Sequence, residues 1–144
     1  MARSFSRSAS FELDLPLAEA RGLFTAEGER LWAEGWDPLF PDPERREGAG
    51  ATFVTAHGPQ QTVWVMTDAE PDRVRYARIV ANVDAGTVEV RLAEAGPGRT
   101  TVTVTYDLTA LGAEGAAAIE DFAASYDETI AHWGHAIDRA LAAR

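Results

Sequence analysis

The chain has 144 residues and no cysteine, which excludes disulfides, thiolate metal sites and thiol nucleophiles. All 13 basic residues are arginine, so Schiff-base and lysine general-base chemistry is excluded as well. A formal net charge of -10 disfavours nucleic acid and anionic membranes as partners. We expect one domain over residues 1–144, a length at which one sizeable core can form.

Nothing in the sequence indicates export or membrane insertion. The N-terminal segment MARSFSRSASFELDL lacks the apolar run of a signal peptide. No window approaches the roughly 18 consecutive apolar residues of a membrane-spanning helix. We therefore expect a cytoplasmic protein, without a cofactor or a metal ion. The sequence leaves open whether the protein forms a homodimer.

The first predicted elements are a strand and two short helices. A strand is expected near Ser6–Leu15, because apolar and acidic side chains alternate there with a period of two. Pro16 ends this strand and suits the first turn of a helix. Short helices are then predicted over Leu17–Thr25 and about Ala26–Glu34.

The segment GERLWAEGWDPLFPDPE, from Gly28 to Glu44, combines bulky apolar side chains with residues that break regular structure. Its apolar side chains include Trp32, Trp36 and Phe40. They require a partner, yet the glycines and prolines prevent a long helix or a central strand. We expect this segment to cover the mouth of an internal pocket, although aromatic residues in such segments also simply complete a core.

Five strand-like runs follow, separated by the turn-forming segments HGPQ, EPD, NVDAG and EAGPG. The short spacing, without helices between the runs, predicts an antiparallel meander with one apolar face. The predicted strands are Ala51–His57, Gln61–Thr67, Arg73–Val80, Thr87–Ala93 and Thr100–Leu108.

A long amphipathic helix is predicted from about Glu114 to Ala142. At about 100° per residue, one side of this helix is apolar, and it carries Ile119, Phe122, Tyr126, Ile130, Trp133, Ile137 and Leu141. Nearly 30 residues would span about 45 Å, so the helix must lie across a whole sheet. The predicted fold class is α+β, with a curved six-stranded antiparallel sheet wrapped around this helix and a space left between them.

The order of elements, together with the segments GERLWAEGWDP, TVWVMTDAEPDRVRYARI, TTVTVTYDLTAL and ETIAHWGHAI, resembles the START-like, or SRPBCC, superfamily and its helix-grip fold. The resemblance runs from about Phe11 to Leu141. It implies a cavity for a hydrophobic small molecule between sheet and helix. Members of the superfamily include polyketide cyclases or aromatases, lipid carriers and activators of a chaperone ATPase.

By this resemblance, the cavity lining should come from the inward strand faces and the apolar stripe of the helix. The aromatic candidates are Trp36, Phe40, Phe53, Trp64, Tyr76, Tyr106, Phe122, Tyr126 and Trp133. The inner face of the strand that holds Trp64 is undecided, because Val63 and Val65 compete for it. Each candidate could also be a residue of the hydrophobic core that contacts no ligand.

Polar candidates are few. Arg78 faces inward if Tyr76 does, and a buried guanidinium must be paired or must hold a ligand anion; alternatively it reaches solvent. His57 could act as a general base, or be an exposed turn residue. One column on the polar face of the helix contains Glu128, His132 and His135. This column faces away from any cavity, which argues against a metal site.

Three functions remain open from the sequence. The first is binding of a hydrophobic aromatic, polyketide or lipid-like molecule, which the aromatic walls favour. The second is a cyclase-like or hydrolase-like enzyme in which Arg78 or a tyrosine polarises a carbonyl group, with the catalytic residues unknown. The third is a chaperone-activator-like interaction domain with an acidic surface.

Overall fold

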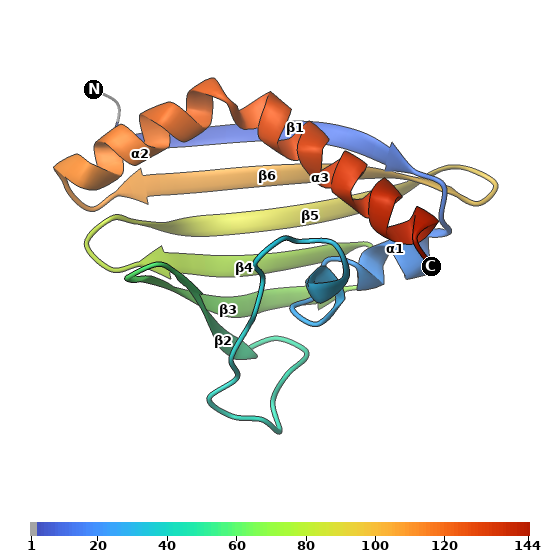
Figure 1. Cartoon of the computed structure of the whole chain (residues 1–144), viewed down its shortest axis with the longest axis horizontal. Helices are drawn as coiled ribbons and strands as arrows, with labels where there is room; N and C mark the ends of the chain where they lie inside the picture. Colours follow the sequence, from blue (N-terminus) through green and yellow to red (C-terminus); the bar gives the residue numbers. More distant parts are fainter. Residues whose placement is uncertain (1–2) are drawn as a thin grey trace.

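The computed structural model describes residues 3–144 as one antiparallel sheet covered on one face by helices (Figure 1). The strands are β1 Ser4–Leu13, β2 Thr52–His57, β3 Gln60–Glu70, β4 Arg73–Val80, β5 Asp84–Gly96 and β6 Arg99–Ala110. The helical elements are α1 Leu17–Gly22, the 3₁₀ turn η1 Gly28–Leu31, α2 Ala113–Ala124 and α3 Tyr126–Ala142. This arrangement confirms the predicted α+β fold class and the predicted order of elements.

The sheet is a meander closed by the N-terminal strand. Its strand order is β1-β6-β5-β4-β3-β2, and every pair is antiparallel. The register places Val88 beside Tyr76 on one side and Tyr106 on the other, so all three share the inner face. On the outer face, Ser8 and Thr105 share a hydrogen bond of 2.7 Å between hydroxyl oxygens. One face is thus apolar and the other polar, as the period-two pattern predicts.

Several strands extend beyond their predicted ends. β3 and β5 run to 11 and 13 residues because their register shifts at Met66/Asp68 and at Glu94/Gly96 let the pairing continue past an irregularity. The turn between β4 and β5 is shorter than NVDAG, since Asn82 adopts a left-handed conformation with φ of 67° and Asp84 already belongs to β5. These extensions lengthen the sheet that carries the cavity.

The single long helix predicted over Glu114–Ala142 is in fact two helices. α2 ends at Ala124 and α3 begins at Tyr126, with Ser125 between them at φ -112° and ψ 13°. The Ser125 hydroxyl donates a hydrogen bond of 3.2 Å to the Asp121 carbonyl, a side-chain contact that competes with the helical backbone pattern. The break lets the two helices follow the curved sheet across β1 and β6 (Figure 1).

The break also seats Tyr126 as an anchor between helix and sheet. Its hydroxyl donates a hydrogen bond of 2.6 Å to the Val104 carbonyl of β6, and the residue is 1% exposed. Further along α3, Gly134 leaves room for the Phe11 ring of β1. A Cβ at this glycine would lie 3.1 Å from the ring, so close approach of a neighbour explains a glycine inside the helix.

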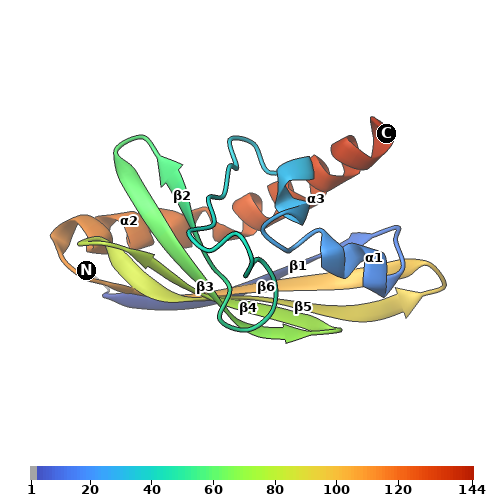
Figure 2. The same ribbon diagram turned by 90° about the horizontal axis from the view of Figure 1, so that it is seen from below.

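The segment between β1 and β2 lies over the sheet beside α3 (Figure 2). The two predicted helices are shorter than expected: α1 ends at Gly22, and the second is only the 3₁₀ turn η1. Leu39 forms an isolated antiparallel bridge with Val54 of β2, with two backbone hydrogen bonds of 2.9 Å. This bridge fixes the tryptophan-containing segment to the edge of the sheet. No helix in residues 3–144 has the length and apolar character needed to cross a membrane.

Candidate ligand cavity

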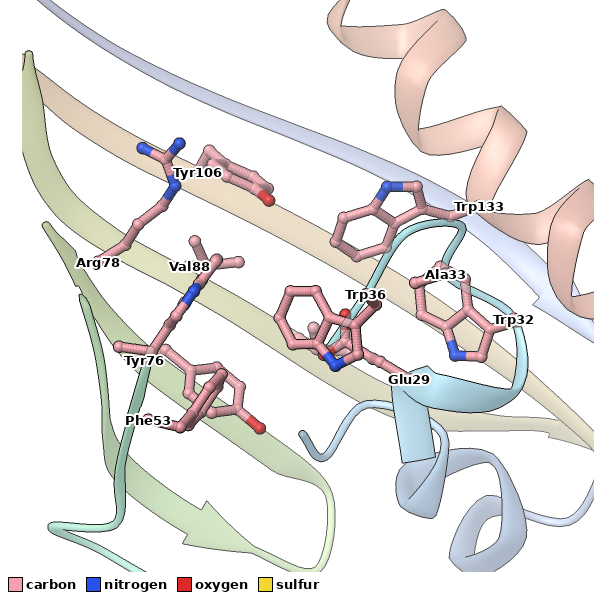
Figure 3. A pocket seen from close by; sticks show the side chains of 12 residues that line it. Glu29, Trp32, Ala33, Trp36, Phe53, Tyr76, Arg78, Val88, Tyr106 and Trp133 are labelled. Atoms are coloured by element: carbon pink, nitrogen blue, oxygen red, sulfur yellow. The ribbon is translucent and has the colours of Figure 1, made fainter. Parts of the chain in front are cut away.

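A cavity of about 240 Å³ lies between the inner face of the sheet, η1 and α3 (Figure 3). Its lining comes from β2 to β6, from the η1 segment and from α3. The lining residues are Glu29, Trp32, Ala33, Trp36, Phe53, Trp64, Tyr76, Arg78, Val88, Val90, Tyr106 and Trp133. An apolar cavity of about 150 Å³ is known to bind benzene, so this volume suits a molecule of one or two rings.

Aromatic rings form most of the cavity wall, and all four tryptophans of the chain take part. The rings of Trp32 and Trp133 lie 5.4 Å apart between centroids, and those of Trp36 and Trp64 lie 5.7 Å apart. Phe53 is stacked on Trp64 with its centroid at 5.9 Å and an interplanar angle of 7°. Such offset and edge-to-face pairs hold the walls in a fixed arrangement.

Backbone and hydroxyl acceptors outside the cavity engage the indole N–H groups of three tryptophans. Trp32 and Trp36 donate hydrogen bonds of 2.8 Å to backbone carbonyls of residues 23 and 26, which precede η1. Trp64 donates one of 3.0 Å to the Thr55 hydroxyl of β2. These bonds orient the rings so that a ligand meets their faces and edges, not their polar atoms.

Arg78 points inward from β4 and is paired. Its guanidinium donates a hydrogen bond to the Asp84 carboxylate at the start of β5, and their side chains are 21% and 7% exposed. The guanidinium also lies 5.8 Å from the centroid of the Trp64 ring. The register that pairs Trp64 with both Phe53 and Arg78 puts these three on the inner face, while Val63 lies on the outer face. The register thus shows which side chains of β3 face inward, a point that the sequence left open.

Glu29 of η1 is the second charged group in the cavity, and the sequence did not single it out. Figure 3 shows its side chain directed from η1 into the cavity. Within residues 3–144, no hydrogen bond or ion pair reaches its carboxyl group, and desolvation alone raises its pKa from 4.5 to about 8. The carboxyl group is therefore largely protonated at neutral pH. A carboxyl group shifted this far in a cleft is a typical feature of a functional site.

The cavity tyrosines differ in what their hydroxyl groups contact. The Tyr76 hydroxyl donates a hydrogen bond of 2.8 Å to the Phe24 carbonyl and thus anchors the segment after α1. The Tyr106 hydroxyl has no hydrogen-bond partner among the described residues and faces the cavity in Figure 3. Burial raises the pKa of both phenols, so both remain protonated. Tyr106 can donate a hydrogen bond to a ligand.

Three of the predicted site residues lie outside the cavity lining. Phe40 packs behind Phe53, at 5.5 Å between ring centroids, because the Leu39 bridge carries the chain past the mouth. The Tyr126 hydroxyl is engaged in the hydrogen bond that anchors α3 to β6, and burial raises its pKa to about 12. Phe122 lines a neighbouring hollow of about 200 Å³ on the far side of Arg78 and Tyr106, because the break at Ser125 turns α2 away from the cavity.

The other polar candidates lie away from the cavity. His57 is exposed at the end of β2, and His132 and His135 are exposed on α3. Across residues 3–144, histidine and carboxylate side chains nowhere gather in a group of three or more that could hold a metal ion.

Solved structures of low sequence identity share this fold. The aromatase/cyclase Zhui from Streptomyces sp. R1128 superposes with a TM-score of 0.67 at 14% identity, over 96% of this chain and 94% of that one. Norcoclaurine synthase from Thalictrum flavum gives 0.70 at 8% identity, over 98% and 88%. The Aha1 dimer from Colwellia psychrerythraea gives 0.61 at 16% identity, over 90% of each chain.

No family model and no curated protein matches the sequence. The likeness is therefore one of fold, and it spans nearly the whole chain. It confirms the resemblance drawn from the order of elements and the quoted segments. The chain has the helix-grip fold of these solved structures, with a cavity between the sheet and the C-terminal helix.

Proposed function

We propose that the protein binds a small hydrophobic molecule with an aromatic body in the cavity between the sheet and α3. The observation that carries this proposal is the cavity of about 240 Å³ with all four tryptophans in its wall. The engaged indole N–H groups support it further, because they leave mainly apolar surface toward a ligand. Burying apolar ligand surface contributes roughly 25 cal/mol per Å².

The test uses naphthylethanol, a neutral two-ring probe, with binding measured by calorimetry and by NMR of the four indole N–H groups. We expect saturable binding that shifts the indole resonances. Val88→Phe should abolish it, because Val88 is 3% exposed and lies in the cavity wall. Val63→Phe, on the outer face of β3, is the matched control. Unchanged indole resonances, or equal binding by the Val88 variant, would refute the proposal.

A second candidate is an enzyme that moves a proton next to a carbonyl group. The observation that favours it is the Glu29 pKa of about 8. A general base works best when its pKa lies near the working pH of the enzyme. The Glu29 carboxylate would remove a proton from the carbon beside the carbonyl, and the Tyr106 hydroxyl would hydrogen-bond the enolate oxygen. The carboxyl proton would exchange with solvent, and the same carboxyl group would then return a solvent-derived proton to the carbon.

Deuterium exchange into the methyl group of acetonaphthone tests this candidate. In D₂O at pH 8, the enzyme hypothesis predicts exchange well above the buffer rate, lost in Glu29→Gln and retained in Glu34→Gln. Glu34 is an exposed carboxylate in the same segment and does not line the cavity. Exchange at the buffer rate in the presence of bound acetonaphthone would leave binding as the function of the cavity.

A further inference from the structure

The charges that face the cavity do not balance. Arg78 and Asp84 neutralise one another, which leaves the Glu29 carboxylate without a positive partner when it ionises. Arg30, the next residue along η1, points elsewhere: its guanidinium donates hydrogen bonds of 2.9 Å to Glu27 and Asp37. An ionised cavity therefore carries one net negative charge. A ligand that brings one positive charge would complete it.

The surroundings of Glu29 also favour a cation. Trp32, Trp36 and Trp133 line the same cavity, and indole faces attract a cation more strongly than other aromatic rings do. Since the N–H groups of Trp32 and Trp36 are engaged outside, these two rings offer the cavity their aromatic carbon surface and not their polar atoms. The formal net charge of -10 on the chain adds a long-range attraction for cations.

An anionic ligand fits the site less well. It would share Arg78 with Asp84, a carboxylate that is 5% exposed and already neutralises the guanidinium charge. Figure 3 shows Arg78 and Glu29 entering the cavity from opposite sides. The charge of Arg78 is thus already neutralised by Asp84, while the charge of an ionised Glu29 is not neutralised. The two ends of the cavity differ in what they can accept.

We propose that the cavity selects a protonated amine carried on an aromatic body, with its ammonium group held by the Glu29 carboxylate and the surrounding indole rings. This inference rests on the proposed function, since it names the chemical class of the ligand for the same cavity. The aromatic body lies against the rings from β2 and β3, and the Tyr106 hydroxyl donates a hydrogen bond to any oxygen that the body carries.

Proton release on binding follows from this arrangement. The titratable or charged groups that face Glu29 across the cavity are Tyr76 and Arg78 of β4 and Tyr106 of β6. The residue that α3 contributes to the lining, Trp133, is neither titratable nor charged. The two phenols stay neutral and Arg78 stays paired, so the Glu29 carboxyl is the group that responds. It holds a proton in the free protein below about pH 8 and must lose it to form an ion pair. Amine affinity should thus rise about 10-fold per pH unit between pH 6 and 8.

The experiment compares three naphthyl probes of one shape: naphthylethylamine, naphthylethanol and naphthylacetate. Calorimetry at pH 8 should give the amine an affinity about 10-fold or more above that of the alcohol, with the acetate weakest. At pH 6.5, titrations in buffers of different ionisation enthalpy should show close to one proton released per amine bound. The alcohol should release none.

Glu29→Gln is the informative variant, because it keeps the shape of the side chain and removes only its charge. It should lose the preference for the amine, the proton release and the pH dependence, while it still binds the alcohol. Glu34→Gln removes an exposed charge from the same segment and should retain all three. A circular dichroism melt of each variant checks that the fold is intact.

The outcomes separate the two proposals. Alcohol binding with no preference for the amine, or a preference that persists in Glu29→Gln, would overturn the amine inference and leave the proposed function standing. Failure of all three probes to bind the wild-type protein would overturn the proposed function, and the amine inference with it. Amine preference that depends on Glu29 alone would support both.

Discussion

Replacing Glu29 with glutamine should stabilise the protein, and the gain should grow with pH. The Glu29 pKa is raised from 4.5 to about 8 in the folded state by desolvation. Between these values the folded protein holds the proton more tightly than the unfolded chain does. Raising the pH through this window therefore destabilises wild-type protein, and the loss is complete above pH 8. Glutamine is uncharged throughout, so the variant escapes this loss.

The magnitude follows from linkage. Each pKa unit is worth about 1.36 kcal/mol, so the full shift corresponds to roughly 5 kcal/mol above pH 8 as an upper bound, because water entering the cavity lowers it. Between pH 5 and pH 7, the unfolding free energy of Glu29→Gln should rise relative to wild type by about 2.5 kcal/mol. This is a large effect against a typical total stability of about 5–15 kcal/mol.

The assay is urea unfolding at several pH values between 5 and 9, on wild type, Glu29→Gln and Glu34→Gln. Taking the difference between variant and wild type cancels every other titrating group. Glu34→Gln should show a difference near zero at each pH, since Glu34 is exposed. A difference for Glu29→Gln that stays flat between pH 5 and 8 would refute the claim that this carboxyl group is desolvated without a partner.

Three further substitutions test the structure around the cavity. Asp84→Asn should cost about 2–3 kcal/mol in urea unfolding because it leaves the Arg78 guanidinium without a counter-charge; the double variant with Arg78→Met should recover part of this loss. Tyr126→Phe should cost about 1 kcal/mol through loss of the hydrogen bond to Val104, measured by thermal melting. Gly86→Ala should strongly lower soluble yield and melting temperature, since its Cβ would lie 1.9 Å from the Asp107 carbonyl oxygen.

Strand periodicity accounts for most of what could be predicted. In β6, valine, tyrosine and leucine alternate with threonine and aspartate, and this fixes which face packs against the helices. The same periodicity in β4 left open whether Arg78 faces inward with Tyr76 or reaches solvent, and the structure places it in the cavity lining beside Tyr76. Asp84 was missed because it stands in a turn-like segment. The signal for it is that a buried guanidinium requires a partner on the next strand.

Glu29 was missed for a different reason. It lies in the stretch predicted as a short helix over about Ala26–Glu34, where no apolar period indicates which way its side chain points. Its direction depends on η1 and on the tertiary contacts that follow. The hydrogen bonds of Trp32 and Trp36 to the residues before η1 fix that turn over the sheet. Contacts of this kind are set by the whole fold, so a local pattern does not reveal them.

The break in the C-terminal helix was also beyond the sequence pattern. The apolar stripe from Ile119 to Leu141 continues through Ser125 without an interruption, and neither proline nor glycine marks the break. At the break, the Ser125 hydroxyl donates a hydrogen bond to the Asp121 carbonyl and the Tyr126 hydroxyl donates one to the Val104 carbonyl of the sheet. As a consequence, Phe122 and Tyr126, which the stripe assigns to the cavity, lie outside its lining.

A crystal structure of the protein soaked with naphthylethanol tests the central claim most directly. We predict electron density for the two rings between Trp36, Trp64 and Trp133, with the surrounding side chains close to their positions in Figure 3. Side chains that collapse to fill this space, or a probe bound only on the outer surface, would contradict the account of a ligand cavity between sheet and helix.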